Sequence, residues 1–394
     1  MGLSFSFSRI PTIHCGTGIL DNITDWLVGR NAKFVLLVTG SSSLERHGHL
    51  GRVQQLITNS GATFEHIQSQ GEPSSDFVDA VSQRLHSQDL DAVIAVGGGS
   101  AIDLGKALAA MIPVGNSVLD HLEGVGKGIS HGGEMLPYLA IPTTSGTGGE
   151  VSKNAVLSQV GVDGYKKSLR HENFIPHAVI LDSDLLIQTE PAITAACGMD
   201  ALTQLLEPYF SDLASPITDA IVWSGLEALV PNLLAACGDG AGRHDVRLGM
   251  AYGALCSGIG LANAGLGIVH GLAGPIGGWF EIPHGVICGT LIGSAQRQNW
   301  LAIQDRAPHH PVIRRMARVG SLMPGAEAIK DEFQLVEHLT TTLEQWVDAL
   351  AIPRLGIFGL KSEDLDRLVL AASNRNNPIQ LSATEIRCLL ERRL

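Results

Sequence analysis

Ala92-Val-Ile-Ala-Val-Gly97-Gly98-Gly99-Ser100-Ala-Ile-Asp103 is the stretch of the chain that decides the fold. Its apolar start predicts a buried strand and its three glycines predict a tight turn. Ser100 with Asp103 three residues later resembles a capping box, which would begin a helix at Ser100. Glycines let a ligand approach the backbone, and a helix N-terminus presents unpaired N–H groups. The stretch therefore predicts a diphosphate site, although its spacing is not GxGxxG and a plain strand-to-helix connection has the same pattern.

Short β-rich runs alternate with helical runs around this stretch, up to about residue 185. We expect strands at 33–38, 63–67, 91–96 and 138–141, and helices at 47–59, 75–85 and 100–111. This alternation is typical of a mostly parallel, Rossmann-like sheet covered by helices. Longer helical runs follow at 217–237, 248–264, 335–350 and 365–372. We therefore predict an α/β dinucleotide-binding domain at 1–185 and an all-helical domain at 186–394.

A second polar turn, Pro142-Thr143-Thr144-Ser145-Gly146-Thr147-Gly148-Gly149-Glu150, follows the strand expected at 138–141. It combines hydroxyl groups with glycines just past the carboxyl end of a strand, which is the edge where open α/β sheets bind ligands. Two such turns in one domain favour a dinucleotide over two unrelated loops.

The second half of the chain carries candidate metal ligands. No Asp, Glu, Lys or Arg lies between Arg247 and Glu281, and His270 and His284 stand at the end of this stretch. Asp200 lies upstream in a helical-looking run. One carboxylate and two histidines can hold a divalent metal and leave one position open. A single histidine is more often a hydrogen-bonded structural residue, so the set is informative only beside the nucleotide signals.

Composition restricts the class of protein. The 394 residues suffice for two cores, with 45% hydrophobic and 17% charged residues. A net charge of −12 argues against a nucleic-acid partner. Six cysteines without CxxC spacing and an N-terminus without signal-peptide features favour a cytoplasmic location. We expect the uncharged stretch to form buried helices packed through glycines rather than to span a membrane.

Four pieces of the chain together resemble the iron-containing (group III) alcohol dehydrogenases. They are Gly97-Gly98-Gly99-Ser100-Ala-Ile-Asp103-Leu-Gly-Lys106, Pro142 to Glu150, Gly198-Met-Asp200-Ala-Leu-Thr, and His270 with Ile-Pro-His284-Gly. The resemblance runs through nearly the whole chain. It implies a dehydroquinate-synthase-like architecture, with the active site in the cleft between the domains. It also implies hydride transfer between NAD(P) and a small alcohol or aldehyde, and we expect a homo-oligomer.

The resemblance further implies which residues form the site. Asp200, His270 and His284 fall on catalytic metal-ligand positions. Gln204 stands where the family has a fourth ligand, a histidine, so we expect it to be a weak fourth ligand or a hydrogen-bond partner of the ligands. Cofactor contacts are implied for Gly40, Ser41, Gly97, Gly98, Gly99, Ser100, Asp103, Thr143, Thr144, Thr147, Asn154 and Lys167. NAD-preferring relatives carry an acidic residue where Gly40 falls, so we expect NADP(H) to be favoured over NAD(H). Gly274 replaces a histidine that the family often has near the nicotinamide.

Other functions stay open at this point. An amide oxygen is a weaker donor than imidazole for Fe²⁺ or Zn²⁺, so Gln204 predicts a metal that is weakly bound or absent. A metal-independent reductase of the maleylacetate type is therefore one alternative. A cofactor-binding protein with a degraded metal site is another, although Asp200, His270 and His284 are intact. A dehydroquinate-synthase-like enzyme would need more basic residues than the motifs contain.

Overall fold

The computed structural model describes residues 4–40 and 42–394, and in this part of the chain six parallel strands form one sheet in the order β1-β8-β5-β4-β2-β3. The strands are β1 (Thr12–Gly16), β2 (Phe34–Thr39), β3 (Thr63–Gln68), β4 (Ala92–Gly97), β5 (Tyr138–Pro142) and β8 (Ala178–Asp182). The predicted parallel sheet is confirmed, and the four strands expected by range agree with the structure to within one residue at each end.

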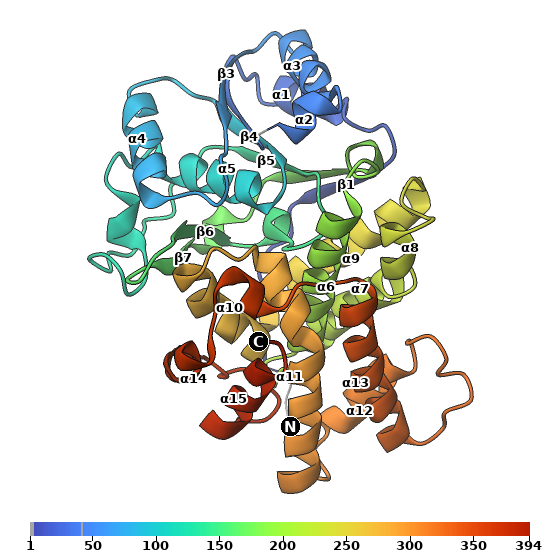
Figure 1. The fold of residues 1–394 in the computed structure, drawn as a ribbon. Coiled ribbons are helices and arrows are strands. Elements are labelled where there is room, and N and C mark those ends of the chain that lie inside the picture. Colours follow the sequence, from blue (N-terminus) through green and yellow to red (C-terminus); the bar gives the residue numbers. More distant parts are fainter. Residues whose placement is uncertain (1–3, 41) are drawn as a thin grey trace.

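Helices cover both faces of this sheet (Figure 1). They are α1 (Asn22–Val28), α2 (Ser43–Arg46), α3 (His49–Asn59), α4 (Ser75–Leu85) and α5 (Gly99–Met111). Successive strand residues point to opposite faces. Leu36 and Val93 therefore pack against α4 and α5, while Leu37 and Ile94 pack against α1 and α3. The inner strands β2, β4, β5 and β8 are apolar on both sides because both faces are buried, whereas the edge strands β1 and β3 keep exposed polar residues.

The helix after the triple glycine begins earlier than the sequence predicts. Gly98 is the N-cap residue with extended backbone (φ −72°, ψ −175°), and α5 starts at Gly99. The capping box expected from Ser100 and Asp103 is wrong, because Ser100 already lies inside the helix. Among the described residues, no side chain caps this end of α5. Its first-turn N–H groups therefore have no side-chain partner within that part of the chain.

A two-stranded antiparallel hairpin of β6 (Asn154–Gln159) and β7 (Tyr165–Arg170) was not expected from the sequence. Lys106 of α5 fixes the segment that leads into it. Lys106 is fully buried, and its Nζ donates to the carbonyl oxygens of Gly149 (2.6 Å), Ser152 (2.7 Å) and Asn154 (2.7 Å) and to Ser152 Oγ (3.1 Å). One buried ammonium group thereby satisfies four acceptors in an irregular segment.

The C-terminal half is helical, as predicted (Figure 1). Its helices are α6 (Pro191–Phe210), α7 (Pro216–Leu229), α8 (Leu233–Cys237), α9 (His244–Ala264), α10 (Ile268–Trp279), α11 (His284–Arg306), α12 (Val312–Gly320), α13 (Glu332–Ala349), α14 (Leu365–Ala371) and α15 (Ala383–Glu391). Short 3-10 turns are η1 (Val118–His121), η2 (Gly149–Val151), η3 (Glu172–Phe174), η4 (Ser183–Leu185), η5 (Leu355–Phe358) and η6 (Ser362–Asp364). The prediction of a single helix at 217–237 is wrong. The structure has two helices, α7 and α8, separated near Pro231, which lacks the N–H that a continuous helix needs.

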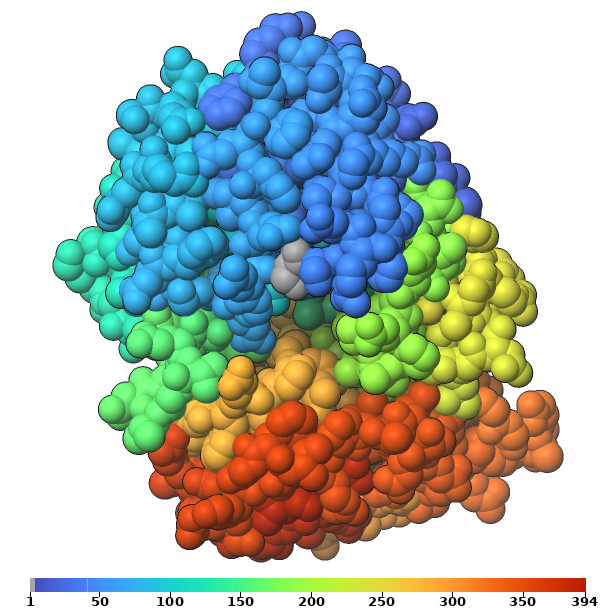
Figure 2. Space-filling view, turned by 45° about the horizontal axis from the view of Figure 1, so that its top comes forward, coloured from blue at the N-terminus to red at the C-terminus, as the bar shows by residue number. Residues whose placement is uncertain are grey.

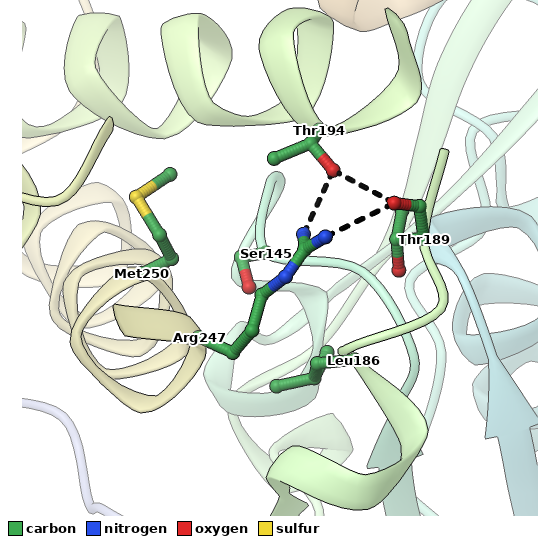
Figure 3. Close-up of a pocket in the computed structure, with 6 residues that line it drawn as sticks. All are labelled: Ser145, Leu186, Thr189, Thr194, Arg247 and Met250. Carbon is green, nitrogen blue, oxygen red and sulfur yellow. Dashed lines mark hydrogen bonds between the residues drawn. The ribbon is translucent and has the colours of Figure 1, made fainter. Parts of the chain in front are cut away.

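Arg247 of α9 ties the helical half to the segment that joins the two halves (Figure 3). It is 3% exposed, and its guanidinium donates to Thr194 Oγ1 (2.8 Å), the Thr189 carbonyl (3.1 Å) and the Ala241 carbonyl (2.7 Å). The boundary predicted at 185/186 falls at the end of η4, just before this segment. The cavity beside Arg247 measures about 10 Å³, room for a water molecule and not for a substrate.

Within residues 4–40 and 42–394, no single helix is long and apolar enough to cross a membrane. Helices α9 and α10 pass that test only as a pair, and they meet at an angle of 98°. Apolar residues of both helices belong to the core of the helical half, among them Met250, Ala254, Ile268 and Leu272.

We expect Lys106→Met to lower the free energy of unfolding by about 3–5 kcal/mol, because four buried acceptors lose a charged donor. Urea unfolding followed by circular dichroism measures this change. The matched control is Lys167→Met, since Lys167 is exposed on β7. The control should change stability by less than about 0.5 kcal/mol. Equal small effects in both variants would contradict a structural role for Lys106.

Candidate active site

Three turns meet at the carboxyl edge of the sheet. The Gly40 N–H donates to the Val96 carbonyl (3.3 Å), and the Thr143 N–H donates to the Gly97 carbonyl (2.9 Å). The turns after β2, β4 and β5 are thereby held side by side, as expected for ligand-binding turns of a parallel sheet. Ser41, which the sequence also assigns to this site, lies outside the described residues.

The three glycines at 97–99 leave the backbone at this edge of the sheet uncovered by their own side chains. A Cβ on Gly97 would lie 2.7 Å from the Ala101 Cβ, so no other residue fits there. Cβ atoms on Gly98 and Gly99 would instead lie 3.4 Å from Thr144 Oγ1 and 3.3 Å from Thr147 Oγ1. Two threonine hydroxyls therefore border the uncapped N-terminus of α5. Exposed amides, a helix dipole and neutral hydroxyls suit a diphosphate.

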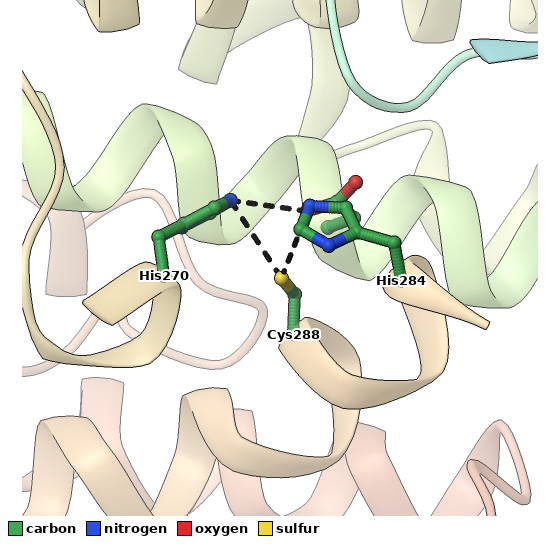
Figure 4. Close-up of side chains that lie close together, drawn as sticks. His270, His284 and Cys288 are labelled. Atoms are coloured by element: carbon green, nitrogen blue, oxygen red, sulfur yellow. Dashed lines mark hydrogen bonds and ion pairs between the residues drawn. The ribbon is translucent and has the colours of Figure 1, made fainter. Parts of the chain in front are cut away.

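Three of the predicted metal ligands, Asp200, His270 and His284, come together from three helices, and Figure 4 shows the two histidines facing each other. Asp200 comes from α6, His270 from α10, and His284 opens α11. Asp200 Oδ1 lies 3.4 Å from His270 Nε2 and 3.8 Å from His284 Nε2. Asp200 is 1% exposed, and its Oδ1 has no hydrogen-bond partner among the described residues. A buried carboxylate oxygen without a donor fits a cation, so these residues suit a divalent metal.

Glu207 anchors His270 from behind. Its Oε2 lies 2.7 Å from His270 Nδ1, and its Oε1 accepts the Val269 N–H at 2.7 Å. A carboxylate on the far ring nitrogen fixes the orientation of a metal-binding imidazole and raises its basicity. Glu207 is not among the site residues predicted from the sequence. The available signal was its spacing, because Glu207 follows Asp200 by two helical turns and so shares its helix face.

The protonation of the cluster follows from its burial. Burial lowers the pKa of His284 to about 4, so this imidazole is neutral at pH 7. Burial also lowers the pKa of His270, but Cys288 and Glu207 outweigh burial and hold it well above its ordinary value. Burial raises the pKa of Asp200, yet His284 and His270 bring it below the ordinary value. The ion-free cluster therefore keeps a proton on His270, and a metal would displace it.

Gln204 lies one turn after Asp200 on α6 but faces the polar turn. Its Nε2 donates to the Thr147 carbonyl (2.6 Å) and to Ser257 Oγ (2.9 Å). The structure thus links α6 to the Thr143–Gly149 turn through Gln204. Gly274, by contrast, faces open space, since a Cβ there would meet nothing within 4 Å.

The structure places Lys166 close to the histidine cluster, while Lys167, predicted as a cofactor contact, lies exposed on the other side of β7. Neighbouring strand residues point to opposite sides, and Lys167 is exposed. The side chain of Lys166 is 7% exposed and forms an ion pair with Glu72. A Cβ on Gly277 would lie 3.1 Å from its Cδ, and its charge helps to lower the pKa of His284. Lys166 is therefore the lysine that lies near the histidine cluster.

Asp103 and Asn154 lie beside the buried Lys106 rather than on the bare turn. Burial raises the pKa of Asp103 to about 7 and that of Glu150 to about 7, and it lowers the pKa of Lys106 to about 8. The Asn154 carbonyl accepts from Lys106, and its Oδ1 accepts from Arg170 Nε at 3.1 Å. Asp103 and Asn154 therefore help to fix the shape of the Pro142–Glu150 turn through their contacts with Lys106.

The space-filling view is hollowed where the N-terminal half, in blue, faces the helical half, in orange and red (Figure 2). The turn at Thr147 and helix α6 meet between the halves through Gln204. The strand edge and the histidine cluster therefore belong to one inter-domain site.

The chain is similar to known dehydrogenases over its whole length. Residues 11–183 match the sequence model of the iron-containing alcohol dehydrogenases, and residues 194–394 match that of the C-terminal part of the same family. Long-chain-alcohol dehydrogenase 1 of Geobacillus thermodenitrificans is 30% identical over 393 residues, covering 97% of this chain and 94% of that protein. NADPH-dependent butanol dehydrogenase of Clostridium saccharobutylicum is 28% identical over 395 residues, covering 98% and 97%.

A solved structure shares the fold. The crystal structure of 1,3-propanediol oxidoreductase has a TM-score of 0.88 to this chain at 24% identity, and the match covers 100% of both chains. At this identity the likeness establishes the fold alone.

We expect Gly98→Val to weaken the binding of both NADPH and NADH by at least about 100-fold, because the side chain would press on Thr144 and cover the α5 amides. Fluorescence titration of the reduced cofactor measures the affinity. Gly274→Val is the control, since a Cβ there meets open space. Unchanged affinity in a folded Gly98→Val protein would remove the diphosphate from this turn.

Proposed function

The chain belongs to the iron-containing alcohol dehydrogenase family, and we propose that it acts as an aldehyde reductase that prefers NADPH and uses one divalent metal. It is an oxidoreductase that interconverts a small alcohol and its aldehyde with NAD(P). The observation that carries the metal-assisted reaction is the buried, unpartnered Asp200 Oδ1 between His270 and His284. Fe²⁺ and Zn²⁺ both suit this set of ligands.

Two groups of residues would act in the reaction, one that binds the cofactor and one that binds the metal. The α5 amides and the hydroxyls of Thr144 and Thr147 would hold the cofactor, which supplies the hydride when bound. Asp200, His270 and His284 would hold the metal, which polarises the carbonyl and stabilises developing negative charge when bound. Gln204 connects the two places, because it lies on the helix of Asp200 and donates to Thr147.

The preference for NADPH rests on Gly40, at the end of β2. Among the described residues, a Cβ at this position would meet nothing within 4 Å, so there is room for a 2′-phosphate, and position 40 itself carries no carboxylate to repel it. The name of the butanol dehydrogenase relative states the same dependence for that protein. Arg46 on α2 is exposed nearby in the chain and is available as a cationic partner.

A metal-independent reductase of the maleylacetate type is the second candidate. The observation in its favour is Gln204, which replaces a family ligand and donates to Thr147 and Ser257. A protein that only binds the cofactor is less well supported, because the three metal-ligand residues converge. We also propose a cytoplasmic homo-oligomer. The free cysteines among the described residues support a reducing compartment.

We expect chelator-treated protein to lose aldehyde reduction, and Zn²⁺ or Fe²⁺ to restore it. His270→Ala should lower kcat/KM by at least about 100-fold, because a Lewis acid supplies several kcal/mol of transition-state stabilisation. His309→Ala is the control, since His309 is exposed. Full activity after chelation together with a nearly silent His270→Ala would favour the metal-independent reductase.

We expect Gly40→Asp to reduce the ratio of kcat/KM for NADPH over NADH by at least about ten-fold, or about 1.4 kcal/mol. The new carboxylate would repel the 2′-phosphate and accept a hydrogen bond from the free 2′-hydroxyl. Gly40→Asn has nearly the same shape without the charge and should change the ratio much less. Equal or better turnover of the natural protein with NADH would refute the preference.

A further inference from the structure

Cys288 lies at the histidine cluster, one helical turn after His284 on α11 (Figure 4). It is fully buried, and its Sγ is 3.6 Å from His270 Nε2 and 3.7 Å from His284 Nε2. Ligand atoms of Asp200, His270, His284 and Cys288 all lie within 4.8 Å of one another. The four side chains thus converge on one small volume.

Three separations in the cluster match those of a shared metal, and the 3.8 Å between Asp200 Oδ1 and His284 Nε2 is slightly longer. Zinc–nitrogen bonds of about 2.0–2.1 Å and zinc–sulfur bonds of about 2.3 Å place two ligands of a tetrahedral centre about 3.5 Å apart. The sulfur-to-nitrogen separations to His270 and His284 are 3.6 and 3.7 Å. The separation from Asp200 Oδ1 to His270 Nε2 is 3.4 Å.

Two further observations indicate that the sulfur has a ligand's role. Asp200 Oδ1 is buried and accepts no hydrogen bond of ordinary geometry among the described residues, and His270 Nε2 faces it at 3.4 Å, as two ligands of one cation would. Gln204, which stands in the usual fourth-ligand position on α6, donates its amide group to Thr147 and Ser257. Residues i and i+4 share a helix face, so His284 and Cys288 on α11 form a second pair that aims at the cluster.

We propose that Cys288 is the fourth protein ligand of the metal that Asp200, His270 and His284 would hold and takes the place that Gln204 leaves, with the substrate oxygen entering as a fifth ligand. The assignment rests on the metal-dependent function proposed above. On binding, the S–H bond breaks, a metal–sulfur bond forms and the proton passes to solvent. A thiolate beside two imidazoles and a carboxylate favours zinc or cobalt over magnesium and manganese. Cys288 on α11 would thus supply the ligand that Gln204 on α6 does not supply.

Substitution with Co²⁺ tests this assignment without measuring activity. The full-length protein, stripped with a chelator and reloaded with CoCl₂, should show a near-ultraviolet thiolate-to-cobalt charge-transfer band. Cys288→Ser should lose that band and bind Co²⁺ roughly 10- to 100-fold more weakly in competition with a chromogenic chelator. Cys256→Ser is the matched control, because Cys256 is also buried but lies in α9 away from the cluster.

The possible outcomes separate the two proposals. Co²⁺ bound by natural protein without the band, or a band that survives Cys288→Ser, overturns the Cys288 assignment and leaves the metal-dependent function intact. Failure of the natural protein to bind Co²⁺ or Zn²⁺ overturns both. Circular dichroism checks folding, and Cys288→Ala serves as a second variant if the serine hydroxyl disturbs the core. Adding Gln204→His to Cys288→Ser should restore affinity without restoring the band.

Discussion

The close approach of two backbones at Gly148 and Gly258 holds the two halves of the site together. A Cβ on Gly258 would lie 2.2 Å from the Gly148 carbonyl oxygen, and a Cβ on Gly148 would lie 2.5 Å from the Gly258 Cα. Gly148 also has a φ of 60°, which L side chains rarely adopt. Helix α9 can therefore lie directly on the polar turn after β5. Because α6 packs beside α9, this contact places Asp200 and the histidines opposite the nucleotide edge.

The buried charges divide into satisfied and unsatisfied groups. Lys106 has four acceptors, and Glu207 has partners at both oxygens. Both residues have structural roles. Lys106 fixes the segment from Gly149 to Asn154, and Glu207 fixes the orientation of His270. Asp200 Oδ1 has no donor among the described residues, although burying a carboxylate is costly. The fold tolerates this unfavourable burial at the position where a bound cation would neutralise the carboxylate. Local destabilisation of this kind is typical of functional sites.

Much of the fold follows from local patterns in the chain. Parallel strands buried on both faces are continuous apolar runs, so β2, β4 and β5 could be predicted almost to the residue. The hairpin of β6 and β7 escaped prediction because its strands mix polar and apolar residues, with only some positions buried. The apolar pattern at 217–237 continues across Pro231 and so predicts one helix where the structure has two, and Ser100 cannot cap α5 because Gly98 is the N-cap residue.

By itself the sequence determined the two kinds of domain and the glycine turns, because apolar periodicity and glycine runs are local patterns, and the family resemblance of its motifs supplied Asp200, His270 and His284 as candidate metal ligands. Only the tertiary structure decided which residues from different elements meet. It turned Lys166 toward the histidine cluster and Lys167 toward solvent through the alternation of side chains along β7. It also brought Glu207 and Cys288 to His270. The physical reason is that periodicity fixes the face of a helix or strand, while the packing of helices and strands against one another fixes what that face touches.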